Sequence, residues 1–118
     1  MRDLEHQIAV VFVAWWAYNH NRFGINEKLL FAVPNGSHRN IGVAKKLKAE
    51  GVRRGVSDYF LCVPRNGKHG LFLELKAEKG RLSKEQGEFI DLANSQGYAW
   101  AIPYGTDQAI KAVEDYIK

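Results

Sequence analysis

The chain has 118 residues, enough for one domain with a hydrophobic core, which we expect to span residues 1–118. Hydrophobic residues make up 46% and charged residues 25%, a composition that indicates an ordinary soluble globular protein and excludes a disordered one. The net charge of +4 suits a polyanionic partner, and the single cysteine, Cys62, excludes an internal disulfide. Cys62 lies in an apolar run, so we expect a reduced and buried thiol.

The first predicted helix covers residues 3–19. Its apolar residues recur at helical spacing and form a stripe of Ile8, Val11, Phe12, Trp15 and Trp16. Val10, Val13 and Ala14 make the flank apolar as well, which predicts burial on more than one side and indicates a subunit interface. The apolar run of residues 8–17 is too short to span a bilayer and lacks the preceding positive charge of a secretory signal. We therefore expect a cytoplasmic protein with no membrane contact.

Seven further elements follow in short segments that glycine and proline residues separate. Their order is strand, helix, two strands of a hairpin, helix, strand and helix, over residues 29–33, 41–50, 58–63, 70–76, 83–95, 98–102 and 106–116. Asn66-Gly67 marks the hairpin turn, and Ser83 is the expected N-cap of the helix that follows the hairpin. This order predicts an α/β fold with a mixed central sheet flanked by helices on both faces.

The hairpin carries the most informative charged residues. Glu74 and Lys76 alternate with leucines along the second strand, so their side chains share one face. A turn at Asn66-Gly67 places Asp58, at the start of the first strand, opposite Glu74. Two carboxylates beside an ammonium group suit the capture of a divalent cation next to a phosphate. A surface ion pair is the simpler interpretation of Glu74 and Lys76 taken alone.

Basic residues gather on and after the second predicted helix, and they are Lys45, Lys46, Lys48, Arg53 and Arg54. As a cluster they suit binding to the phosphates of DNA, although a solvated surface charge is the simpler explanation of any one of them. Glu5 lies near the start of the first helix, where a carboxylate is favoured by the helix dipole in any case.

Four segments resemble, in the same order, the VRR-NUC (virus-type replication-repair nuclease) domain of the PD-(D/E)xK nuclease superfamily, in its stand-alone phage and bacterial form. They read VPNGSHRN, KAEGVRRGVSDYFLCV, GLFLELKAEKGRLSKEQ and GYAWAIPYGTDQAIKAVEDYI, and they cover nearly the whole chain. The chain departs from the family at Ser57, where a proline usually precedes the metal-binding aspartate. Because that proline supplies no ligand, the departure changes little. The resemblance implies a restriction-endonuclease-like core and the hydrolysis of phosphodiester bonds in DNA.

Carried over by position, the resemblance implies a site that holds Mg²⁺ or Mn²⁺. Asp58, Glu74 and the backbone carbonyl of Leu75 would be the ligands, in keeping with the preference of Mg²⁺ for oxygen ligands and retained waters. Glu5 matches an acidic residue of the family's first helix and would complete the site through a water or with a second ion.

The resemblance also implies roles beside the metal. Lys76 would contact the attacking water or the scissile phosphate, by positioning and charge stabilisation rather than by proton abstraction. Gln86 would orient the water or a phosphate. Asn35 and Arg39 match a polar loop of the family that would touch the scissile phosphate; an ordinary turn residue and a solvated charge are the alternative for these two.

By resemblance we expect a DNA-repair endonuclease of a bacterium or a phage-infected host cell that cuts Holliday junctions. Such junctions need two cuts related by two-fold symmetry, which a homodimer supplies, and the surplus apolar side of the first helix would form its interface. Three alternatives remain open at this stage. They are a nuclease for flaps, nicks or duplex DNA, a catalytically idle DNA-binding module, and an ordinary α/β domain with surface charges.

Overall fold

The computed structural model describes residues 2–34 and 41–118, and these form four α-helices and four short strands. The helices are α1 (Arg2–Asn19), α2 (Ile41–Ala49), α3 (Lys84–Ser95) and α4 (Thr106–Ile117). The strands are β1 (Leu30–Ala32), β2 (Tyr59–Leu61), β3 (Leu71–Leu73) and β4 (Ala99–Ala101). Each element lies where the sequence predicts it. Two 3-10 helices between α1 and β1, η1 (His20–Phe23) and η2 (Glu27–Leu29), were not predicted.

The four strands form one mixed sheet in the order β1-β2-β3-β4. β1 and β2 are antiparallel, β2 and β3 form the antiparallel hairpin, and β4 runs parallel to β3 after the crossover through α3. The mixed sheet agrees with the fold class that the sequence predicts.

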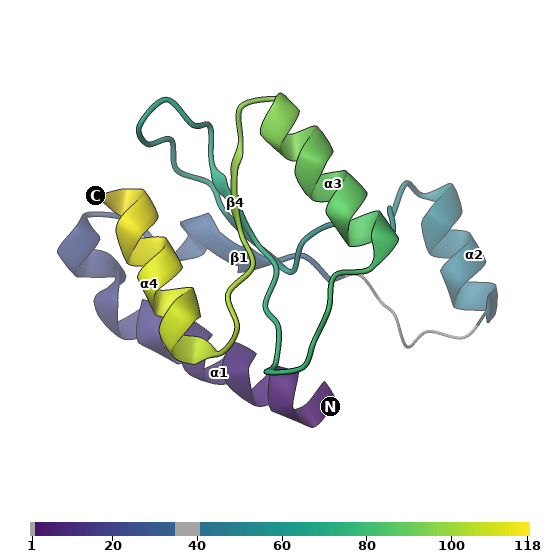
Figure 1. Ribbon diagram of the computed structural model, residues 1–118, viewed down its shortest axis with the longest axis horizontal. Coiled ribbons are helices and arrows are strands. Elements are labelled where there is room, and N and C mark those ends of the chain that lie inside the picture. The colour runs from purple at the N-terminus through teal and green to yellow at the C-terminus, as the bar shows by residue number, and fades with distance from the viewer. Residues whose placement is uncertain (1, 35–40) are drawn as a thin grey trace.

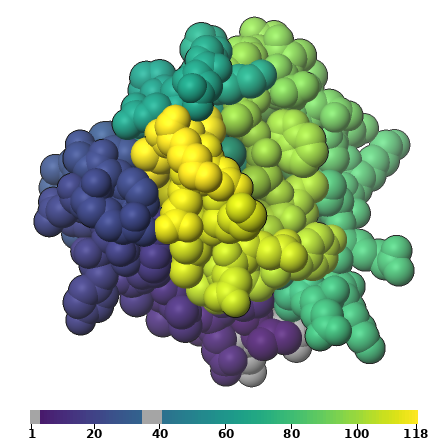
Figure 2. Space-filling model, turned by 60° about the vertical axis from the view of Figure 1, so that its left-hand side comes forward, coloured from purple at the N-terminus to yellow at the C-terminus, as the bar shows by residue number. Residues whose placement is uncertain are grey.

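Helices cover both faces of this sheet, as Figure 1 shows, with α1 and α4 on one side and α3 on the other. The main core lies on the α1 and α4 side, where Phe12, Trp16 and Val113 are buried against Leu61 and Leu73 of the sheet. In Figure 2 the surface of α4 lies directly against that of α1. The leucines of the hairpin therefore point into the core, and alternate residues point toward α3.

Aromatic residues occupy the opposite face of the sheet. Phe60 and Phe72 are paired across β2 and β3, with their ring centroids 4.5 Å apart. Phe89 of α3 meets Phe72 edge to face at 5.0 Å, which is a favoured arrangement of two aromatic rings. This contact fixes α3 over the face from which Glu74 and Lys76 also project.

The hairpin turn has the geometry that its sequence predicts. Asn66 and Gly67 both have positive φ, at 51° and 80°, and the backbones of Arg65 and Lys68 are bonded to each other on either side. Three residues separate Arg65 from β2, but only two separate Lys68 from β3. The β2 arm thus contains one extra residue, which shifts the register of the hairpin.

Two predictions about burial were wrong. Cys62 is exposed, because it follows β2 on the aromatic face, which α3 covers only in part. Val11 is 55% exposed although it belongs to the predicted apolar stripe, because the buried side of α1 centres on Phe12 and Trp16. Val10 and Val13 are exposed too, so α1 is not buried on more than one side within this chain. Across the described part of the chain, no helix combines the length and apolarity that crossing a membrane requires.

Candidate active site

Glu74 and Lys76 are held by a backbone ladder that continues beyond β3. The amide of Glu74 donates to the carbonyl of Ala101, and that of Lys76 donates to Pro103, each at 3.0 Å. Gly105 N donates back to the Lys76 carbonyl at 3.0 Å. The segment after β3 therefore stays parallel to the segment after β4, and the two charged side chains project from a rigid support.

Asp58 lies directly opposite Glu74 when the register of the hairpin is extended by one pair. Its Oδ2 accepts a hydrogen bond from the Leu75 amide at 2.9 Å, which ties the carboxylate to the neighbouring strand. The carbonyl of Asp58 also accepts from Val33 N at 2.7 Å, so both sides of this residue are fixed. The structure therefore brings the two predicted acidic residues together on the face that α3 covers.

Gln86 of α3 bridges the other two charged residues. Its Nε2 donates to Glu74 Oε2 at 3.0 Å, and its Oε1 accepts from Lys76 Nζ at 3.0 Å. Lys76 Nζ also lies 3.5 Å from Glu74 Oε2. Both charged side chains are almost fully buried, with exposures of 9% for Lys76 and 3% for Glu74. The cluster is thus a buried network, and the simpler interpretation as an exposed surface ion pair is wrong.

A capping box holds Gln86 in place. The Ser83 hydroxyl accepts from Gln86 N at 3.1 Å, while Gln86 Oε1 accepts from Ser83 N at 2.9 Å. The same amide oxygen therefore serves the start of α3 and the ammonium group of Lys76. Ser83 was predicted as an N-cap, but its link to Gln86 was not predicted, although the Ser-x-x-Gln spacing of a capping box indicates it.

Burial and mutual repulsion raise the pKa of both acidic groups. Desolvation and the nearby Asp58 carboxylate raise the pKa of Glu74 to about 8, despite the opposing charge of Lys76. Desolvation also raises the pKa of Asp58 above its ordinary value, although the bond from Leu75 N opposes this. Without a cation, the site therefore favours one shared proton over two negative charges.

The arrangement suits a divalent cation. When Glu74 is ionised, its Oε1 is buried and has no hydrogen-bond donor among the described residues. A buried carboxylate oxygen without a donor, beside a second carboxylate, is what a hard cation would neutralise. Glu5 is near enough to raise the pKa of Asp58. However, no three His, Cys, Asp or Glu side chains within residues 4–34 and 41–118 lie close enough together to hold a metal ion.

The predicted basic residues lie on a separate, exposed lobe. Lys45, Lys46 and Lys48 are exposed on α2, and Arg53 and Arg54 are exposed on the segment that follows it. The segment that follows α2 reaches the start of α3, since a Cβ atom on Gly55 would lie 2.4 Å from the Glu85 carbonyl oxygen. The predicted phosphate contacts Asn35 and Arg39 lie outside the residues that the structure describes.

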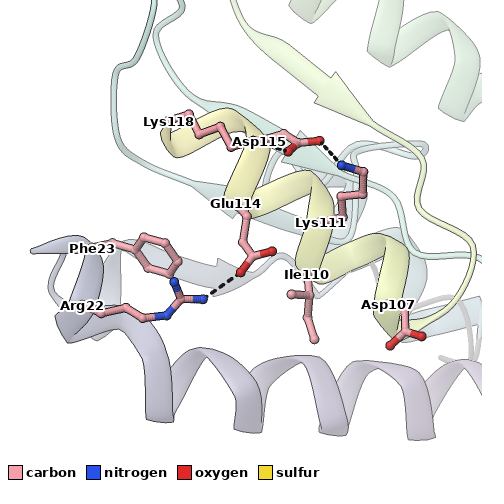
Figure 3. A pocket seen from close by; sticks show the side chains of 8 residues that line it. All are labelled: Arg22, Phe23, Asp107, Ile110, Lys111, Glu114, Asp115 and Lys118. Atoms are coloured by element: carbon pink, nitrogen blue, oxygen red, sulfur yellow. Dashed lines mark hydrogen bonds and ion pairs between the residues drawn. The ribbon is translucent and has the colours of Figure 1, made fainter.

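Figure 3 shows an open surface hollow between η1 and α4. It contains the ion pair between Arg22 and Glu114, with the Arg22 Nη2 and Glu114 Oε2 atoms 2.7 Å apart. None of the residues that line it belongs to the cluster around Glu74. Because Arg22 is already paired, we assign no chemistry to this hollow.

Comparison with known proteins agrees with this site. A solved structure described as a VRR_NUC domain protein superposes with a TM-score of 0.82 at 24% identity, over 97% of this chain and 88% of that one. That likeness establishes the fold. The family model of the VRR-NUC domain matches residues 3–107. No curated protein shows a significant match.

The fold and the family together define the class of protein, a nuclease of the PD-(D/E)xK type. Within this class, the chain belongs to the VRR-NUC family.

Proposed function

We propose that this protein is a metal-dependent, structure-selective DNA endonuclease, with residues 1–118 acting as a single nuclease domain in the cytoplasm. The observation that carries the proposal is the buried network in which Gln86 joins Glu74 to Lys76. Burying two carboxyl groups and an amine costs desolvation free energy, and the ion pair that they form does not offset this cost enough to stabilise the fold. Such clusters of perturbed acids are typical of catalytic sites.

Asp58, Glu74 and the backbone carbonyl of Leu75 would hold Mg²⁺ or Mn²⁺. Bound there, the ion would lower the pKa of a water molecule and neutralise charge on the phosphate in the transition state. Glu5 would act through a water molecule or on a second ion, since it does not complete a three-acid group with the other two.

Lys76 would place its ammonium group against the attacking water or the scissile phosphate. Its position next to Glu74 is fixed by the Gln86 amide, so the charge is aimed before the substrate binds. The bond between Lys76 and Gln86 Oε1 leaves other ammonium protons free to reach a phosphate. The exposed basic residues of α2 and the following segment, with Asn35 and Arg39, would contact the flanking phosphates.

A homodimer that cuts four-way junctions is the form of this activity that we propose. α1 exposes Val10, Val11 and Val13, at 53%, 55% and 44%, and Tyr18 at 90%. An apolar helix face of this kind suits a two-fold contact between copies. Two copies would then present two sites to the two strands that must be cut.

Cleavage assays in Mg²⁺ or Mn²⁺ on a four-way junction, a flap, a nicked duplex and a linear duplex test this proposal, with light scattering for the mass. We expect a dimer that cuts the junction preferentially and symmetrically. Val13→Arg should yield monomers that lose symmetric cleavage, while Leu92→Arg, at an exposed leucine of α3, should not. A strict monomer at micromolar concentration would refute junction resolution. Preference for a flap, nick or duplex would keep the nuclease and change its substrate.

A further inference from the structure

The segment between β3 and α3, which we call the 77–82 loop, folds back over the side chain of Lys76. Gly80 N donates to the Ala77 carbonyl at 2.8 Å and closes a tight turn. A Cβ atom on Gly80 would lie only 3.1 Å from Lys76 Cδ and 3.3 Å from Lys76 Cβ. The loop therefore touches the aliphatic stem of Lys76 and lies next to the proposed catalytic cluster.

Tyr104 fixes the loop in that position. Its hydroxyl donates to the Gly80 carbonyl at 3.0 Å. Its own backbone pairs with that of Lys76 in an isolated parallel bridge, and its amide donates to Gln108 Oε1 at 2.8 Å. The residues on either side of Tyr104, Pro103 and Gly105, thus bond the backbone of Lys76, while the Tyr104 hydroxyl holds the turn that covers the Lys76 side chain.

The loop also presents positive charge to solvent. Lys79 and Arg81 are exposed on either side of Gly80. Neither makes an ion pair within the described residues, although Glu78 precedes them and is itself exposed. In Figure 2 the surface in the colour of residues near 80 stands out at the lower right edge of the molecule. Two free cations on a fixed turn are better placed for a partner than cations on a mobile chain, because less side-chain and loop freedom is lost on binding.

We infer that the 77–82 loop is a second phosphate-binding segment, in which Lys79 and Arg81 contact the DNA backbone on the strand next to the scissile phosphate. Each strand of DNA carries one phosphate per roughly 3.4 Å of helix axis, so a phosphate beside the one at Lys76 comes within reach of both side chains. Tyr104 is then a positioning residue, because it sets where the two cations lie without touching DNA. This inference rests on the proposed function and adds a site outside the α2 lobe.

The test measures binding and cleavage of a fluorescent four-way junction by the full chain. Binding is measured by anisotropy in EDTA over a range of salt concentrations, and cleavage is measured in Mn²⁺. The variants are the double substitution Lys79→Ala/Arg81→Ala and, as a matched control of equal charge change, Lys28→Ala/Lys68→Ala. Lys68 is exposed in the turn of the β2–β3 hairpin, and Lys28 is exposed in η2, just before β1 at the end that pairs with Leu61; both lie at the end of the sheet away from Asp58.

We expect the double variant to weaken binding at least tenfold and to reduce the slope of log K against log salt by about two, since each lost phosphate contact removes about 0.9. Its KM should rise by more than its kcat falls. The control should match the wild type. If the double variant binds with wild-type affinity and salt slope while the wild type cuts DNA, the loop is not a DNA contact and only this inference fails. If the wild type neither binds nor cuts DNA, the proposed function fails and the inference fails with it.

Tyr104→Phe separates positioning from mere structural support. It removes one hydroxyl and keeps the ring, so thermal stability should change little. We expect a three- to tenfold weaker affinity and a smaller salt slope in the wild-type background, and no further change when Lys79 and Arg81 are already alanine. Equal effects of Tyr104→Phe in both backgrounds would overturn its assignment as a positioning residue for these two cations.

Discussion

Replacing Glu74 by glutamine should make the metal-free protein more stable at alkaline pH while abolishing its nuclease activity. The pKa of Glu74 is about 8 in the folded chain, against 4.5 as its ordinary value. A carboxyl group with a raised folded pKa binds its proton more tightly in the folded state than in the unfolded state. The resulting stabilisation is complete below pH 4.5 and is lost as the pH rises through about 8.

The size of this loss follows from the difference between the two pKa values. Each unit is worth about 1.4 kcal/mol, so the wild type should lose up to about 5 kcal/mol of unfolding free energy between pH 4.5 and 9. Glu74→Gln carries no charge there and still offers an acceptor to Gln86 Nε2, so it should avoid this loss. The higher unfolding free energy of Glu74→Gln at alkaline pH is expected only without metal, because a bound cation offsets the repulsion between Glu74 and Asp58.

Urea denaturation in EDTA at several pH values between 5 and 9 measures this difference. The unfolding free energy of the wild type should fall as the pH rises, relative to that of Glu74→Gln. With Mn²⁺ in place of EDTA, the ion should stabilise only the wild type at pH 8 to 9. Glu88→Gln, which removes an exposed carboxylate from α3, serves as the control and should follow the wild type. Parallel curves for the wild type and Glu74→Gln would refute the claim that Glu74 is buried against a second carboxylate.

Three further predictions concern neighbouring residues. Gln86→Ala should lower the cleavage rate about 100-fold in a single-turnover assay, because Lys76 loses its fixed position. Gln96→Ala, at the far end of α3, should not lower it. Equal cleavage rates for Gln86→Ala and the wild type would contradict the bridging role. Gly55→Ala should lower the unfolding free energy by at least about 2 kcal/mol in urea, because φ is +87° and the new Cβ would lie 2.4 Å from the Glu85 carbonyl oxygen; an unchanged midpoint would contradict this contact. Ser57→Ala should raise the unfolding free energy by about 1 kcal/mol, since the Ser57 hydroxyl is buried without a partner among the described residues; a loss of stability would show that the hydroxyl is bonded.

The sequence predicts the elements of this fold well because its apolar residues have clear periods and its turns have clear signals. The alternation around Glu74 and Lys76 and the Asn66-Gly67 turn predict the hairpin, which the structure contains. The exact pairing is less accessible. The pairing of Asp58 with Glu74 that we predicted follows only if the hairpin is centred on Asn66, and the structure contains that pairing. A two-residue turn at Asn66-Gly67 with equal arms would instead pair Asp58 with Leu75 and place Asp58 on the face opposite Glu74.

The one extra residue in the β2 arm restores the pairing of Asp58 with Glu74, because a one-residue shift turns every side chain of a strand to the other face. No local sequence pattern predicts this extra residue in the β2 arm. The exposure of Val11 and Cys62 was missed for a related reason, since apolar composition says which side chains favour burial but not which faces other elements cover.

A role for Gln86 in the site could be predicted only from the resemblance to the VRR-NUC family, and its bridge between Glu74 and Lys76 was not predicted. The capping box is visible in the sequence, but the same amide reaches Lys76 and Glu74 only because Phe89 packs α3 onto Phe72. Tertiary packing of this kind cannot be deduced from spacing along the chain.

Calorimetric titration of the protein with Mn²⁺ tests the central claim most directly. At pH 7 the wild type should bind the ion and release protons, seen as a heat that depends on the ionisation enthalpy of the buffer, because the pKa of Glu74 is about 8 before the metal binds. Asp58→Asn and Glu74→Gln should show no such binding. A wild type that takes up no Mn²⁺ at millimolar concentration, and that still cleaves DNA in EDTA, would contradict the account.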